Sequence, residues 1–458
     1  MKKSRLVVTG FACALSFALM AGCSSSGDQG QAGGTTTPDG VTLKVTYQKT
    51  ASVTGIDTMM TKAKAEYEKT YPGNKIELIP IEAEQDQYFT KLALMNGSAE
   101  TAPDLMYEDT FQIRSDAAAG YLQPIDEYIA DWDEWERFFD NAKQAGVGDD
   151  GKIYGISTGT DTRGLYFNKE IFAAAGLPTD WQPKSWDEIL DAARAIKAKV
   201  PDVIPFNIAA GKAGGEGTSM NGFQMLLYGT KDPLMDLSTN KWLTGSQGFK
   251  DSLAFYETVY SQGLGPDPSE ALDANWGSRV WTELIPAGKV AIALDGSWLP
   301  SRWIAGDTAW AEWEDVIGFA AMPTQNGEDP GFISMSGGWT IAVGANCENP
   351  KEAVDFLKIA LSRESSLEFY KEQGQIAVRD DIAEDPEYLS HNSSFEFFSS
   401  LVQYTHFRPA TPDYSQISSN IPVATEAVAT GQLSPADAQA AYDQALIAIV
   451  GEDATQAG

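Results

Sequence analysis

Sulfur and imidazole side chains are scarce in this chain. Its 458 residues include three cysteines, Cys13, Cys23 and Cys347, and two histidines, His391 and His406. Three scattered thiols provide neither a disulfide framework nor a thiolate cluster, and the two histidines lack the spacing of metal ligands. We therefore expect no disulfide-stabilised scaffold, no metal site and no cofactor.

Basic residues are also few. Lysine and arginine number 33 against 64 aspartates and glutamates, which gives a formal net charge of −31. A polyanion of this kind is repelled by nucleic acids and by anionic lipid surfaces. Nucleic-acid binding is thereby excluded, whereas the acidity says little about a small ligand because most of it belongs to a solvated surface.

Long apolar runs are missing beyond the first residues. No segment after residue 22 is long and apolar enough to span a bilayer, so a membrane channel would have to be a separate partner. The start itself has a basic stretch (residues 2–5), an apolar stretch (residues 6–20) and then Met20-Ala21-Gly22-Cys23. This order resembles a bacterial lipoprotein signal peptide.

The lipoprotein resemblance implies that residues 1–22 are removed and that Cys23 becomes the lipid-modified first residue. Residues 23–40 are rich in serine, glycine and threonine and would form a flexible tether. The protein would then be anchored by lipid on the extracytoplasmic face of the cell membrane. An ordinary secretory signal with a chance cysteine is the alternative.

The chain is too long for one small core, and we expect two domains. Strands predicted at 41–47, 76–81 and 104–107 alternate with helices at 56–67 and 85–95, a pattern that favours a parallel sheet. A further helix is predicted at 186–199, opened by a capping box in which Ser185 and Glu188 take part.

One stretch, Gly288–Trp298, carries the strongest hint of a binding site. Its apolar run, residues 290–294, predicts a strand buried on both faces, and Asp295-Gly296-Ser297-Trp298 follows at once. The same arrangement recurs where Glu108-Asp109 follows residues 105–107, and at the turn that leads to Trp339. Open α/β sheets bind ligands beyond the carboxyl ends of their strands. A capping or core role explains any one of these residues equally well, but the recurrence favours a ligand site.

The order of motifs resembles the extracellular solute-binding proteins of bacterial ABC importers, in the sugar-binding branch that includes maltose-binding protein. The resemblance runs from about residue 41 to the last helix. The matching stretches are Ala102–Asp104, Tyr154–Ile156, Leu165–Glu170, Ala175–Leu177, Pro183–Glu188, Gly288–Trp298, Gly338-Trp339 and Lys351–Leu361.

This resemblance implies a two-lobed periplasmic-binding-protein-like α/β fold, each lobe a mostly parallel sheet flanked by helices. It also implies a hinge with several crossings, a monomer, and no enzymatic activity. We place the crossings near residues 156–160, 323–331 and 374–378. The first lobe would comprise 41–157 with 332–373, and the second 161–322 with 379–451. An oligosaccharide would be held between the lobes and delivered to the transmembrane subunits of an ABC permease.

Sugars have flat apolar faces and a rim of hydroxyl groups, so aromatic rings and hydrogen-bonding side chains are needed together. The 12 tryptophans and 17 tyrosines exceed what a core of this size needs. The stacking candidates are Trp339 (with Gly338 in its turn), Trp298 and, third, Trp276. The hydroxyl acceptors are Asp295, Asp109 and Glu108, and the other polar candidates are Lys49, Gln48, Asp161 and Arg163, with Arg379 and Arg408 as weaker ones.

Three hypotheses remain open at this point. The first is a transport receptor that binds an oligosaccharide without altering it. The second is a secreted, lipid-anchored glycosidase, because paired carboxylates in an aromatic cleft are also its signature. Glu108 and Asp109 are poorly suited to that role, since adjacent residues on a strand point to opposite faces. The third is a receptor for a non-sugar solute, such as a peptide, a polyamine or a metal chelate.

Overall fold

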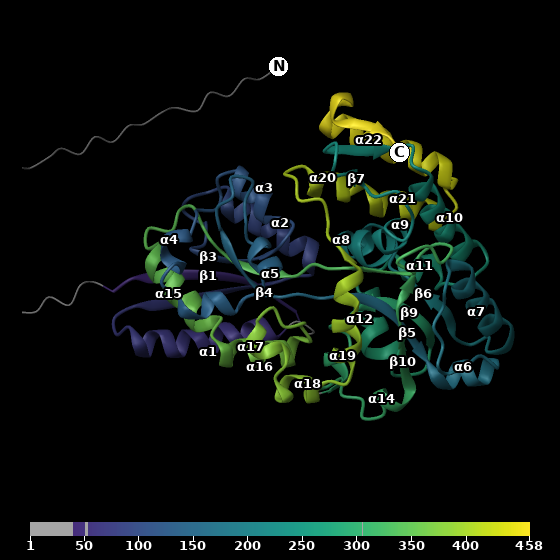
Figure 1. Ribbon diagram of the computed structural model, residues 1–458, viewed down its shortest axis with the longest axis horizontal. Coiled ribbons are helices and arrows are strands. Elements are labelled where there is room, and N and C mark those ends of the chain that lie inside the picture. Colours follow the sequence, from purple (N-terminus) through teal and green to yellow (C-terminus); the bar gives the residue numbers. More distant parts are fainter. Residues whose placement is uncertain (1–39, 51–53, 305) are drawn as a thin grey trace, which may run out of the picture. The chain divides into compact units, whose positions relative to one another are not determined.

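Two separate β-sheets organise the chain from Gly40 onward (Figure 1). The computed structural model describes residues 40–50, 54–304 and 306–458. The predicted signal peptide (1–22), Cys23 and all but the last residue of the tether (23–40) lie outside the described residues. Among the helices that are described, none has the length and apolar character that a membrane crossing requires.

The first sheet has five strands and is mixed rather than mostly parallel. Its strands, in spatial order, are β2 (Lys75–Glu82), β1 (Thr42–Lys49), β3 (Leu105–Asp109), β13 (Trp339–Val343) and β4 (Gly155–Gly159). β1 is parallel to β2 and β3, as the alternating pattern predicted. β13, which enters this sheet after the chain has passed through the second one, is antiparallel to both β3 and β4.

Helices cover both faces of the first sheet. They are α1 (Gly55–Thr70), α2 (Gln85–Asn96), α3 (Ile113–Ala118), α4 (Asp126–Ile129), α5 (Asp140–Gln144), α15 (Pro350–Ala360), α16 (Arg363–Gln373), α17 (Asp380–Ala383) and α18 (Pro386–His391). Alternate residues of β3 enter different cores: Leu105 and Tyr107 join the core on one face, and Met106 joins the smaller one on the other. We call this sheet with its helices the first lobe.

The second sheet has four strands and is also mixed. In spatial order they are β10 (Ile317–Ala320), β5 (Arg163–Asn168), β9 (Val290–Gly296) and β6 (Ile204–Asn207). All seven residues of β9 are buried, as its unbroken apolar run predicted. β9 is parallel to β6 but antiparallel to β5. Two small sheets complete this part, made by β7 (Met235–Asp236), β8 (Lys241–Thr244), β15 (Thr455–Ala457), β11 (Met322–Pro323), β12 (Phe332–Met335) and β14 (Thr405–His406).

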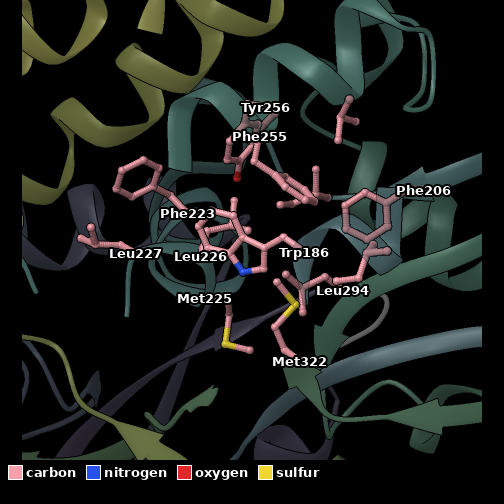
Figure 2. Close-up of a cluster of buried hydrophobic side chains, with 14 of the residues drawn as sticks. Trp186, Phe206, Phe223, Met225, Leu226, Leu227, Phe255, Tyr256, Leu294 and Met322 are labelled. Atoms are coloured by element: carbon pink, nitrogen blue, oxygen red, sulfur yellow. The ribbon is translucent and has the colours of Figure 1, made fainter. Parts of the chain in front are cut away.

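The helices of the second lobe pack around two apolar cores, and Figure 2 shows side chains of the larger one. They are α6 (Lys169–Ala175), α7 (Trp186–Lys199), α8 (Gly215–Gly217), α9 (Gln224–Leu227), α10 (Gln247–Ser261), α11 (Pro268–Ala271), α12 (Trp276–Arg279), α13 (Ser301–Ile304), α14 (Trp313–Val316), α20 (Tyr414–Ser418), α21 (Asn420–Ala429) and α22 (Pro435–Val450). α7 has the predicted bounds, and the Ser185 hydroxyl accepts the Glu188 amide at its start. Figure 2 shows Trp186 of this helix among the core side chains.

The chain passes between the lobes several times. It leaves β4 at Gly159 and enters β5 at Arg163. β12 contributes Ile333 and Met335 to the second core, so the next crossing lies between Met335 and Trp339, later than the expected 323–331. α17 and α18 pack into the first core, although the expected division assigns residues from 379 onward to the second lobe. α19 (Ser394–Ser400) contacts both, through Phe395 and Phe398.

Candidate functional site

A cavity of about 390 Å³ lies between the two lobes. Its first-lobe wall includes Phe89 of α2 and Phe111, which follows β3. The second lobe contributes Lys212 and Glu216. Small-molecule sites in proteins usually measure about 300 to 1,000 Å³, so this cavity has the size of a ligand site.

An aromatic wall continues from the cavity into the first lobe. The Trp339 ring stacks on Tyr107 with centroids 4.6 Å apart and planes 12° apart. Phe89 lies 5.6 Å from Trp339 and also 5.6 Å from Phe111, so the four rings form a continuous surface. Trp339 is only half-buried, whereas Tyr107 is buried behind it.

Local backbone geometry places Trp339. It is the first residue of β13 and pairs with Asp109, the last residue of β3, which brings two predicted site residues side by side. The preceding Gly338 has φ +131°, and a Cβ there would lie 2.3 Å from the Gly159 carbonyl oxygen. Only glycine fits this position, because the turn crosses close over the neighbouring strand.

Asp109 belongs to a buried ionic cluster that also contains Arg408 and Glu216. Arg408 Nη2 donates to Asp109 Oδ1, and Arg408 Nη1 lies 3.5 Å from Glu216 Oε1. Burial raises the pKa of the Glu216 carboxyl, and the Arg408 guanidinium acts in the opposite direction. The weaker sequence candidate Arg408 is therefore central to the arrangement.

Asp161 and Arg163 form a second buried pair beside the first. Arg163 Nη1 donates to Asp161 Oδ1, and its Nε donates to Asn221 Oδ1 at 3.0 Å. The Arg163 guanidinium lies 4.9 Å from the ring centroid of Trp298, a cation–π contact that covers part of this half-buried indole. Trp298 thus lies next to the charged residues of this pair.

Asp295 joins the cluster on the second-lobe side. It accepts a hydrogen bond of 2.6 Å from Trp281 Nε1. Burial raises the pKa of Asp295 to about 6, although hydrogen bonds from Trp281 and Gly296 and the charges of Arg163 and Arg302 lower it. Burial likewise lowers the pKa of Arg302 to about 10.

Three other sequence candidates have partners that give them structural roles. Trp276 is 5% exposed in a core of the second lobe, and its Nε1 donates to Asn207 Oδ1 at 3.0 Å, so its ring faces protein rather than a ligand. Lys49 forms an ion pair of 2.8 Å with Asp57. Gln48 is buried and donates to the Ala83 carbonyl, which fixes the start of the segment leading to α2.

Glu108 points away from Asp109, because the two are adjacent on β3. Its side chain is fully buried, and its carboxyl lies beside that of Asp116. Burial raises the pKa of Glu108 well above its ordinary value, and the nearby Asp116 carboxyl adds to the rise. Glu108 therefore lies on the face of β3 opposite Asp109, where burial favours the protonated form of its carboxyl.

The raised pKa of Glu108 predicts a specific pH dependence. A carboxyl whose pKa is higher in the folded than in the unfolded state stabilises the fold at low pH, and this stabilisation is lost as pH rises through the folded-state value. Glu108→Gln should therefore gain stability relative to the unmodified protein as pH rises, by about 1–3 kcal/mol. Denaturant unfolding between pH 5 and 9 would measure it, with exposed Glu82→Gln as the control. Parallel pH curves for Glu108→Gln and the unmodified protein would contradict the assignment.

Several residues of the site escaped the sequence analysis. Phe89 and Phe111 resembled ordinary apolar positions of a helix and a loop. Glu216 lies in a glycine-rich loop without the Lys-Ser/Thr of a phosphate loop, and Asn221 and Trp281 gave no signal. What identifies each of them is a contact that only the folded chain makes, across separations that range from 14 residues for Trp281 and Asp295 to 198 for Glu216 and Tyr414.

A two-lobed α/β architecture with an aromatic and charged cavity between the lobes defines the class of periplasmic binding proteins. The family model described as "Bacterial extracellular solute-binding protein" matches residues 50–366, and the chain belongs to this family. The protein is accordingly a non-enzymatic component of transport, as predicted.

Individual relatives agree with this assignment. The galactooligosaccharide-binding protein of Bacillus subtilis is 23% identical over 77% of this chain and 77% of its own length. A solute-binding protein of Thermotoga lettingae, solved with α-D-tagatose, has a TM-score of 0.76 at 23% identity, covering 90% of this chain and 100% of its own. The GacH receptor of Streptomyces glaucescens, solved unliganded and with acarbose, has a TM-score of 0.74 at 21% identity, covering 90% and 99%. The predicted two-lobed fold class is confirmed.

Proposed function

We propose that the protein is the substrate-binding component of an ABC sugar importer that captures a neutral oligosaccharide between its lobes and hands it to a permease. The observation that carries this proposal is the wall of Trp339, Tyr107, Phe89 and Phe111 beside buried carboxylate and guanidinium groups. Aromatic rings complement the faces of a sugar and the charged groups its hydroxyl rim. The galactooligosaccharide-binding relative supports the same class of ligand.

A thermal-shift screen of the purified protein against a glycan library tests the proposal, followed by calorimetric titration of each hit. We expect saturable binding of at least one oligosaccharide, a change in tryptophan fluorescence, and recovery of the sugar intact by chromatography. Silence across neutral, acidic and amino sugars would overturn the sugar assignment in favour of another solute. Shortened products would contradict a pure binding role.

We also propose that the hinge consists of the crossings around residues 160–162 and 336–338 and of the segment near Ile376. Thr160 and Ile376 exchange backbone hydrogen bonds of 3.1 and 2.8 Å, and the Thr160 hydroxyl donates to the Gly337 carbonyl at 2.9 Å. These hydrogen bonds join the crossing segments to one another, so we expect the lobes to rotate about one connected hinge. We propose a monomer as the binding unit.

Lipid attachment at Cys23 is a further part of the proposed function. Cys23→Ser is expected to shift the protein from the detergent phase to the aqueous phase in a phase-partition experiment on expressing bacteria, because the acylated residue is lost. Mass spectrometry of the mature amino terminus would show the acyl chains directly. Cys13→Ser, which falls within the predicted signal, is the matched control and should partition normally; equal partition of Cys23→Ser would contradict lipidation.

A further inference from the structure

A buried ion pair joins the two lobes inside the cleft. Arg408, which follows β14 in the second lobe, donates from Nη2 to Asp109 Oδ1 at the end of β3 in the first lobe. The same nitrogen lies 3.3 Å from Thr110 Oγ1. The Arg408 and Asp109 side chains are 4% and 7% exposed, so solvent ions screen their attraction very little.

The second lobe holds Arg408 in a fixed orientation. Glu216 faces its other terminal nitrogen, and Glu216 is itself oriented by the Tyr414 hydroxyl, which donates to Oε1 at 2.7 Å, and by the Ser418 hydroxyl, which donates to Oε2. Gln224 Nε2 in turn donates to the Tyr414 hydroxyl oxygen at 2.8 Å. Arg408 is therefore presented to the first lobe by a rigid network and moves with the second lobe.

The first lobe offers Arg408 more than a carboxylate. The guanidinium carbon lies 4.7 Å from the centroid of the Phe111 ring, a cation–π contact. At the crossing between the lobes, Gly337 leaves the space that the arginine uses, since a Cβ there would lie 3.1 Å from Arg408 Nη2. The Arg408 side chain is thus surrounded by Asp109, Phe111 and the crossing at Gly337.

Separation of the lobes would take Arg408 away from both Asp109 and Phe111. Opening would return water to both groups, so the pair favours closure only by the excess of its direct attraction over the hydration regained; close, well-oriented charge pairs between protein surfaces can have such an excess. We propose that Arg408 is an inter-lobe latch that holds the ligand-free cleft closed through Asp109. Since this deepens the proposed binding function, the balance of closed and open ligand-free molecules would set the apparent sugar affinity.

The test uses the ligand-free full-length protein and needs no sugar. Small-angle X-ray scattering of Arg408→Gln should give a larger radius of gyration, with the closed-to-open ratio lowered about tenfold or more. Arg408→Lys should lie between, because an ammonium group keeps the charge but cannot meet two partners as a planar guanidinium does. Arg194→Gln removes an exposed arginine paired with Asp191 and should leave the radius unchanged.

A double-mutant cycle shows whether Asp109 is the partner. Asp109→Asn should enlarge the radius of gyration by a similar amount. The double variant should have a radius little larger than either single variant, because both substitutions remove the same contact. An unchanged radius of gyration in Arg408→Gln would overturn the latch, whether or not the unfolding temperature falls. Changes in radius that add fully in the double variant would also overturn it. If Arg408→Gln fails to fold, Arg408→Lys and Asp109→Asn carry the same test. A negative result here leaves sugar binding intact, and a silent glycan screen leaves the latch intact.

Discussion

Replacing Trp339 by alanine is expected to weaken sugar binding about thirtyfold or more, equivalent to about 2 kcal/mol. The indole is half-buried, lies flat on Tyr107 and contacts Phe89 of the cavity lining, so a sugar ring could pack on its free part. Alanine would remove that apolar platform while Tyr107 remains behind it. Trp339→Phe keeps a smaller ring and should lose only a fewfold. Calorimetric titration with the sugar found in the glycan screen would measure each change.

The matched control for Trp339 is Trp135→Ala. Trp135 is also partly buried and stacks on another tryptophan, Trp132, but its ring neighbours are Trp132 and Phe138, whereas Trp339 contacts Phe89 of the cavity lining. It should alter the unfolding temperature without altering sugar affinity. Wild-type affinity in Trp339→Ala, or equal losses of affinity in both variants, would contradict a stacking role for Trp339.

Local signals in the sequence were sufficient for much of the fold. The helix at 186–199 was predicted with its observed bounds, since its capping residues and apolar stripe lie within one segment. The buried strand β9 was likewise evident from its own composition. The mixed direction of both sheets was not predicted, because it depends on which strands return from the other lobe.

For the candidate site too, local features were predictable and long-range contacts were not. Asp109, Asp295, Trp298 and Trp339 were chosen as candidates because each lies at or near the end or start of a strand. In the structure Asp109 pairs with Trp339 across two strands, Asp295 accepts from Trp281, and Trp298 lies under Arg163. Trp276 was a third stacking candidate, yet it begins α12 and is buried in an apolar core of the second lobe. Sequence position reveals which residues leave a strand, but not which of them the rest of the chain then covers.

Long-range contacts account for the part of the site that could not be predicted. Glu216 is held by Tyr414 and Ser418, about two hundred residues later, and Arg408 meets Asp109 from 299 residues away. No periodicity or spacing links such positions in a single sequence. The charged centre of the cleft is therefore a property of the folded chain, while its aromatic and acidic strand ends are visible beforehand.

Arg379→Ala should lower the free energy of unfolding by about 3–5 kcal/mol, the largest stability loss that we expect. The Arg379 side chain is fully buried. It forms ion pairs of 2.7 Å with Glu134 and 2.8 Å with Asp381, and it donates to the Leu361 carbonyl oxygen at 2.9 Å. Alanine would leave a cavity beside Phe138, over which the guanidinium lies, and would free three segments of the first lobe from one another.

Sugar affinity of the folded Arg379→Ala molecules should stay within about twofold of the original, since these partners all lie in the first lobe away from the cavity lining. Arg137→Gln is the control: Arg137 pairs with Asp380 at 3.7 Å, with both side chains about half exposed, and such pairs contribute about 0–1 kcal/mol. Denaturant unfolding of the unmodified protein, Arg379→Ala and Arg137→Gln would measure the loss of unfolding free energy in each variant. A loss in Arg379→Ala no larger than in the control would contradict the structural role, and a selective loss of sugar affinity would return Arg379 to the ligand-binding candidates.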